Sequence, residues 1–168
     1  MRFMERAPAI LLTATGALLA SVAAAAAGEQ TVKWETIIGI IMPGNTVDGI
    51  TGAGQPWSTL GGKARVDLAS GRAEFEVRGL VLAGGNAIGT PGAITMVEGT
   101  LACNTTPPVA INTPLVPLSA RGDAEFEGTI GPIPTTCTPA NVAFLIRIQS
   151  TPTDRWIANG AVRTAPGM

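Results

Sequence analysis

The feature that most constrains the fold is a short pattern, Gly-x-Ala-Glu-Phe-Glu, that occurs twice, at Gly71–Glu76 and at Gly122–Glu127. In each copy Ala and Phe alternate with charged residues, which is the period of a strand with one buried face and one solvated face. No segment after residue 28 shows a sustained helical period. We therefore predict an all-β protein, a two-sheet antiparallel β-sandwich in which the two copies are equivalent strands of its two halves. A small β-barrel is the alternative.

The first 27 residues have the features of a helical secretory signal peptide. Arg2 and Arg6 precede a mostly apolar stretch, and the alanine-rich run before Gly28 contains an Ala-x-Ala cleavage pattern. A retained membrane anchor is the alternative, but alanine is only weakly apolar and no basic flank follows the run. We expect a cleaved signal peptide over residues 1–27 and a single β-sandwich domain over residues 28–168. The mature protein is then secreted, periplasmic or held at the cell surface, without membrane contact of its own.

Cys103 and Cys137 are the only cysteines in the chain. In an oxidising compartment an even number of cysteines predicts a disulfide, and two residues permit only one pairing. A disulfide that closes the chain segment between Cys103 and Cys137 should stabilise the fold by about 4 kcal/mol on the loop-entropy model. A redox pair or a metal site is the alternative, but the sequence has no Cys-x-x-Cys and no histidine that could complete a zinc shell.

Alternation and turn signals predict about nine short strands along the chain. The strongest hairpin joins Lys63–Leu68 to the first copy of the repeat, with opposite charges facing each other on its outer side. The apolar run Val142–Ile146 predicts a central strand covered on both faces. In the strand expected over Ala93–Cys103, we place Ile94 and Met96, or their neighbours, inward and Glu98 outward.

The amino-acid composition excludes several kinds of function. The chain contains no histidine and no tyrosine, so Ser-His-Asp catalysis, Cys-His catalysis and histidine-ligated metals are not available. The basic residues are scattered and the formal net charge is −1, which gives no electrostatic basis for nucleic-acid binding. Carboxylate chemistry, a Ser58–Lys63 arrangement or binding without catalysis remain.

Two groups of residues are candidates for a functional site. The clustered carboxylates could form a calcium site or the acid pair of a glycosidase; they are Glu74, Glu76, Glu125 and Glu127. An ordinary solvated strand face with basic neighbours is the competing interpretation. The tryptophans Trp34, Trp57 and Trp156 could form a ligand-stacking platform, although burial in the core is the more common role of such residues. We expect no other cofactor.

These observations favour an exported, non-catalytic binding or structural module whose partner is an extracellular protein or glycan. The alternative is a carboxylate-based extracellular glycoside hydrolase. Asn104-Thr105-Thr106 also forms an acceptor triplet for N-glycosylation, which matters only in a host that modifies such sites.

Overall fold

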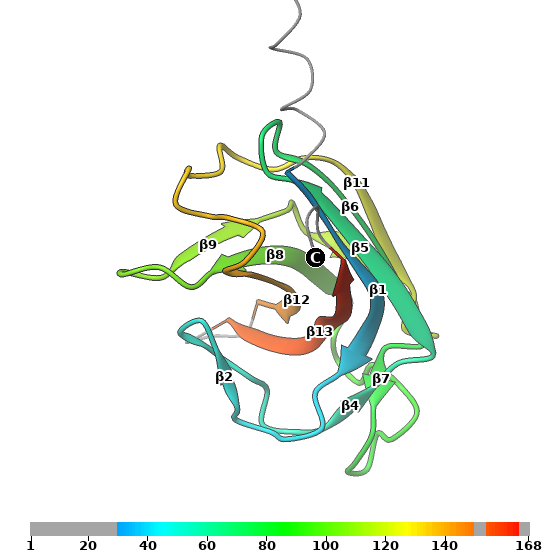
Figure 1. The fold of residues 1–168 in the computed structure, drawn as a ribbon. Coiled ribbons are helices and arrows are strands. Elements are labelled where there is room, and N and C mark those ends of the chain that lie inside the picture. The colour runs from blue at the N-terminus through cyan, green and yellow to red at the C-terminus, as the bar shows by residue number, and fades with distance from the viewer. Residues whose placement is uncertain (1–29, 150–153, 165–168) are drawn as a thin grey trace, which may run out of the picture.

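The fold consists of β-strands joined by turns and loops (Figure 1). The computed structural model describes residues 30–149 and 154–164, and these contain no helix. The strands are β1 (Thr31–Gly39), β2 (Thr46–Val47), β3 (Ile50–Thr51), β4 (Trp57–Ser58), β5 (Gly61–Asp67), β6 (Arg72–Arg78), β7 (Val81–Leu82), β8 (Met96–Cys103), β9 (Val109–Asn112), β10 (Val116–Pro117), β11 (Ala124–Thr129), β12 (Val142–Ile148) and β13 (Arg155–Thr164). The all-β prediction is confirmed. Within the described ranges no helix is long and apolar enough to cross a membrane.

Nine of the strands form one large antiparallel sheet in the order β10-β8-β12-β13-β1-β5-β6-β11, with β9 also paired to β8. The sheet curls into a half-barrel, with β1, β5, β6 and β11 along one wall and β8, β12 and β13 across from them (Figure 1). Its two end strands, β10 and β11, come into contact without pairing. Two small two-stranded sheets, β2–β3 and β4–β7, accompany the large one.

The hairpin predicted around the first copy of the repeat is present as β5–β6. Lys63 lies opposite Glu76 and Arg65 opposite Glu74, so opposite charges face each other as expected. Asp67 holds the turn, because its Oδ1 accepts hydrogen bonds from the N–H groups of Ala69 (2.9 Å) and Ser70 (3.0 Å). The bond from Ser70 is the main reason that the pKa of Asp67 lies below its usual value.

The core lies inside the curl and is centred on aromatic rings from three strands. Phe144 of β12 packs against Trp34 of β1 and Phe75 of β6, with ring centroids 5.6 and 5.7 Å apart. Two glycines make room for these rings: a Cβ on Gly99 would meet Phe75 and Phe144, and a Cβ on Gly160 would meet Trp34. The packing of the aromatic core therefore depends on two positions without a side chain.

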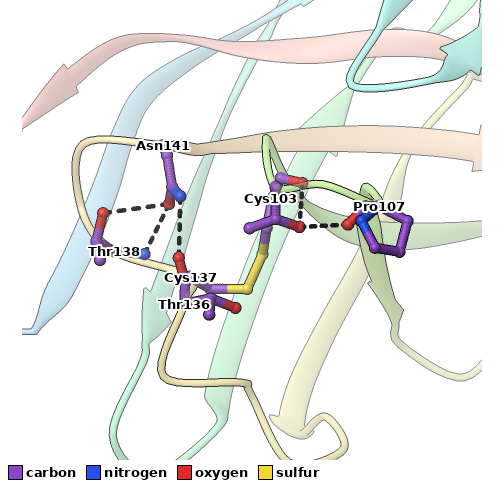
Figure 2. The surroundings of a disulfide bond; sticks show 7 residues. Cys103, Pro107, Thr136, Cys137, Thr138 and Asn141 are labelled. Carbon is purple, nitrogen blue, oxygen red and sulfur yellow. Dashed lines mark hydrogen bonds between the residues drawn. A yellow bond between two sulfur atoms is a disulfide. The ribbon is translucent and has the colours of Figure 1, made fainter.

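Strand β12 lies between β8 and β13 and is buried along nearly its whole length, which confirms the prediction of a central strand. The predicted disulfide is also present. It joins Cys103, the last residue of β8, to Cys137 in the loop between β11 and β12 (Figure 2). Asn141 shapes this loop: its Oδ1 accepts the N–H of Thr138 (2.7 Å) and its Nδ2 donates to the carbonyl of Thr136 (2.9 Å).

Two expectations about the arrangement of the strands are wrong. The copies of the repeat are not in opposite halves of a sandwich; they are neighbours, β6 and β11, in the same sheet. In β8, Glu98 is buried instead of solvated, whereas the buried inward position is Val97, a neighbour of the exposed Met96, as the prediction allowed. Both faces of β8 are covered, so the side chains on its outer face are buried as well.

Candidate functional site

The four candidate glutamates lie together on the outer side of β6 and β11. The antiparallel register places Glu74 directly opposite Glu127 and Glu76 directly opposite Glu125. Between these pairs, Phe75 lies opposite Phe126 on the inner side. Like charges that face each other across two strands repel, so this arrangement needs compensation from nearby cations or from solvent.

Basic side chains compensate two of the four carboxylates. Glu76 contacts the Nζ of Lys63 (3.7 Å) and the Nε of Arg78 (3.5 Å), while Glu127 accepts a hydrogen bond from Arg72 (2.9 Å). All of these side chains are well exposed, so each pair contributes less than about 1 kcal/mol. For Glu74 and Glu125 no ion pair is present among the described residues.

The glutamates do not gather into a metal-binding cluster. In the part of the chain that the structure describes, no three Asp, Glu, Cys or His side chains come close enough together to hold a metal ion. A calcium ion prefers six to eight oxygen ligands. The extended spacing along two strands, with basic residues between the carboxylates, does not resemble such a cage.

The three tryptophans are in the core and form no exposed platform. Their exposed fractions are 2% for Trp34, 4% for Trp57 and 4% for Trp156. Trp34 packs on Gly160, Trp57 is held by the β4–β7 pair, and the Nε1 of Trp156 donates to the carbonyl of Asn45 beside the β2–β3 hairpin (3.1 Å). Burial of these large rings stabilises the fold and leaves no ring face free for a ligand.

A hollow lies where the two ends of the large sheet meet. This cleft measures about 630 Å³, and Val116 and Pro117 of β10 lie on one side of it and Ala124 and Glu125 of β11 on the other. A neighbouring hollow of about 490 Å³ extends over the paired glutamates and again includes Val116. We call the two hollows together the seam cleft.

Some of the carboxylates of the seam cleft have structural partners, whereas Glu74 and Glu125 have no ion pair among the described residues. Asp123 Oδ1 accepts the N–H of Gly79 (3.0 Å), and its Oδ2 accepts from the hydroxyl of Ser119 (3.4 Å), so this side chain fastens the turn that leads into β11. Glu76 is engaged by Lys63 and Arg78. Ser58, considered above as a nucleophile, lies in β4 opposite Val81, whereas the Nζ of Lys63 points to Glu76.

A buried ionic group on β8 and β12 was not predicted from the sequence. Glu98 is 3% exposed and Arg147 8% exposed, and they lie opposite each other with Oε1 and Nη1 3.8 Å apart. Arg147 also contacts Asp154 (3.1 Å) and Asn112 (3.3 Å). Burial raises the pKa of Glu98, while the positive charge of Arg147 opposes that rise. A sequence signal existed: Arg147 directly follows an apolar run assigned to a strand covered on both faces, so its charge needed a buried partner.

The buried ion pair is not fully hydrogen-bonded. Neither the Oε1 of Glu98 nor the Nε of Arg147 has a hydrogen-bond partner among the described residues.

Comparison of the chain with protein-family models, with curated proteins and with solved structures found no match.

Proposed function

We propose that the protein is an exported, non-catalytic binding module, and that its ligand binds in the seam cleft. The observation that carries this proposal is the cleft itself: it brings the apolar Val116, Pro117 and Ala124 together with charged residues, a combination typical of ligand sites. Three of the carboxylates that line it, Glu76, Asp123 and Glu127, support the fold through ion pairs and turn hydrogen bonds. The ligand is an extracellular protein or a glycan.

The architecture is best described as a small, incompletely closed barrel, because one sheet supplies both walls around the core. Its end strands, β10 and β11, are in contact but not hydrogen-bonded as a pair. In this description the seam cleft is the gap that closure would remove. A ligand could therefore bind between β10 and β11 without displacing any strand of the sheet.

The disulfide between Cys103 and Cys137 is compatible with an oxidising location outside the cytoplasm. The alanine-rich leader of residues 1–27 supplies the route of export in this proposal, with cleavage near Gly28. Export places the seam cleft where it can meet a partner in the periplasm, on the cell surface or in the medium.

A carboxylate-based glycoside hydrolase has less support. Such an enzyme needs a general acid with a raised pKa in a cleft that admits a sugar. Glu98, a described carboxyl group whose pKa is raised, is buried against Arg147, whereas the accessible Glu76 and Glu127 are paired with basic side chains.

The experiment is a binding screen of the mature protein on glycan and peptide arrays, accompanied by a hydrolysis assay on a broad glycoside panel. Pro117→Trp places a bulky ring in the cleft and should abolish binding, whereas Ile41→Trp, at a position that is exposed and outside the cleft, should not. Turnover of a glycoside that is lost in Glu76→Gln or Glu127→Gln would overturn the proposal. Binding that is equally strong in both tryptophan variants would place the site elsewhere.

A further inference from the structure

Strand β11 ends the large sheet, and one of its edges is not paired with another strand among the described residues. The hydrogen bonding shows which of its backbone groups face that edge. The N–H of Ile130 donates to the carbonyl of Gly71 (2.9 Å), and this pair continues the register that aligns Thr129 with Arg72. In antiparallel sheets hydrogen-bonded and non-hydrogen-bonded pairs alternate.

This alternation directs the backbone groups of Phe126 and Gly128 toward β6 and those of Glu125, Glu127 and Thr129 toward the open edge. No backbone or side-chain partner for these three edge residues' N–H groups is found within residues 30–149 and 154–164. Exposed strand edges of this kind are templates for the addition of another strand.

The outer charges change in a regular way across the sheet toward this edge. On β5 the outward residues Lys63 and Arg65 are basic; β6 carries both signs; and on β11 the outward residues Glu125 and Glu127 are acidic. The β5 cations lie opposite the β6 glutamates, but the β11 glutamates face glutamates. On β11 only Glu127 has a cation from β6, through its contact with Arg72, and Glu125 has none among the described residues. A further strand with basic residues opposite Glu125 and Glu127 would supply the missing cation and add to the existing one.

The inner side of the same edge is apolar. Phe126 is only partly buried, although its ring packs on Phe75 with centroids 6.1 Å apart, and Val116 across the seam cleft is also partly buried. Apolar side chains of an added strand would complete the burial of these two residues. An occupant should therefore alternate basic and apolar residues.

We propose that the open edge of β11 binds an extended polypeptide with alternating basic and apolar residues, which joins the sheet as an antiparallel or parallel strand. This proposal deepens the proposed function, since it names the class of partner for the seam cleft. Main-chain hydrogen bonds supply affinity in strand addition, and alternate side chains supply specificity. A second copy of this chain is a poorer occupant, because pairing β11 with β11 would place two further glutamates beside Glu125 and Glu127.

The first test is binding of a fluorescent peptide of alternating lysine and valine, matched in length to β11, with a glutamate–valine peptide as the control. The lysine peptide should bind, and high salt should weaken its binding. The double variant Glu125→Lys/Glu127→Lys should weaken this binding by about tenfold or more and favour the glutamate peptide. We expect this double variant to fold, because the new lysines lie opposite Glu76 and Glu74 and so replace like-charge pairs with opposite-charge pairs.

The second test asks whether the peptide binds as a strand. The bound lysine peptide should slow hydrogen exchange at the N–H groups of Glu125, Glu127 and Thr129, which face the open edge. Thr129→Pro removes one such N–H without changing the charge and should weaken binding, whereas Thr129→Ala should not. A melting curve confirms that both variants are folded.

The outcomes separate this proposal from the proposed function. Binding of the peptide without protection of the three N–H groups, or binding unchanged by the lysine double variant, would overturn strand addition. Selective binding of a glycan in the seam cleft would keep the binding module and overturn the peptide partner. A concentration-dependent dimer whose contact protects the same N–H groups would assign the edge to a second copy and also overturn it.

Discussion

Phe75 and Phe126, the aromatic residues of the two repeat copies, lie directly opposite each other in β6 and β11, with their rings stacked at a centroid distance of 6.1 Å. The two residues differ in burial. Phe75 is 3% exposed and also contacts Phe144, whereas Phe126 is only partly buried because β11 is the last strand of the sheet. The repeat pattern alone predicts two equivalent core residues, but only Phe75 is buried in the core.

This difference predicts unequal effects of truncation. Phe75→Ala should lower the free energy of unfolding by about 3–5 kcal/mol, because it removes a fully packed ring from the aromatic core. Phe126→Ala should cost about 1–2 kcal/mol, since part of that ring already contacts water. Urea unfolding of the two variants measures both values. Equal losses would show that the edge of β11 is covered in solution.

Most of the secondary structure could be predicted because alternation identifies a strand and its two faces. It does not identify the neighbouring strand. The hairpin around Gly71 was predictable since its strands are adjacent in sequence, whereas the pairing of β6 with β11 depends on a long connection whose path has no local signal. Two strands with similar sequences can pair with each other in one sheet, or they can occupy equivalent positions in two separate sheets, and the sequence pattern is the same in both cases.

The candidate site was predicted less well than the fold, for reasons of environment. A charged residue in a strand is normally assigned to the solvent side, and this rule failed for Glu98 because β8 is covered on both faces. The tryptophans could stack on a ligand or fill the core, and only the surrounding structure decides between the two. The seam cleft depends on how far the sheet curls, which no local pattern encodes.

The paired glutamates predict a small, asymmetric response to removal of charge. Glu125→Gln should leave stability unchanged or raise it by about 0.2–0.5 kcal/mol, because Glu125 faces Glu76 and has no basic partner among the described residues. Glu127→Gln should not be stabilising, since it weakens the contact with Arg72. Thermal melts at low salt compare the two. A calcium-dependent rise in Tm that disappears in Glu125→Gln would instead indicate a cation site.

The disulfide should account for a large part of the stability. Cys103 and Cys137 are both buried and 34 residues apart, so their bond restricts the unfolded chain and fixes the β11–β12 loop to the end of β8. Cys103→Ala/Cys137→Ala should lower the free energy of unfolding by about 4 kcal/mol on the loop-entropy model. Denaturant unfolding with and without reductant is the measurement. Reductant should destabilise the natural protein and have no effect on the double variant; equal stability of the two proteins would contradict the prediction.

The packing around Gly99 predicts that no larger residue fits at this position in the core. A Cβ at this position would lie 2.8 Å from the ring of Phe144 and 2.9 Å from that of Phe75. Gly99→Ala should therefore destabilise the fold by about 1–3 kcal/mol through overpacking. Gly131→Ala is the matched control, since nothing lies within 4 Å of its added Cβ. Similar melting temperatures for the two variants would mean that the aromatic cluster can rearrange at little cost.

The buried pair of Glu98 and Arg147 predicts a dependence of stability on pH. Burial raises the pKa of Glu98 in the folded protein, so the folded state holds this proton more tightly than the unfolded state. The contribution of Glu98 is therefore most favourable below its unfolded pKa of about 4.3 and is lost as the pH rises through the raised folded pKa. Glu98→Gln removes this titration. The stability of the natural protein relative to that variant should fall as the pH rises from acid toward neutral, measured by urea unfolding at each pH. Glu125→Gln is the control, because it removes a carboxylate that is exposed to solvent instead of a buried one.

The same pair predicts a non-additive double variant. Arg147→Met leaves the carboxylate of Glu98 buried without its cation and should cost about 3–5 kcal/mol at neutral pH. Adding Glu98→Gln to Arg147→Met should recover much of that loss, because the buried charge is then gone and the methionine keeps the apolar contacts of the arginine stem. Denaturant unfolding of the two single variants and the double variant gives the coupling energy. If the effects simply add, the carboxylate of Glu98 must reach water when Arg147 is removed, and β8 is then less completely covered in solution than its burial in the structure implies.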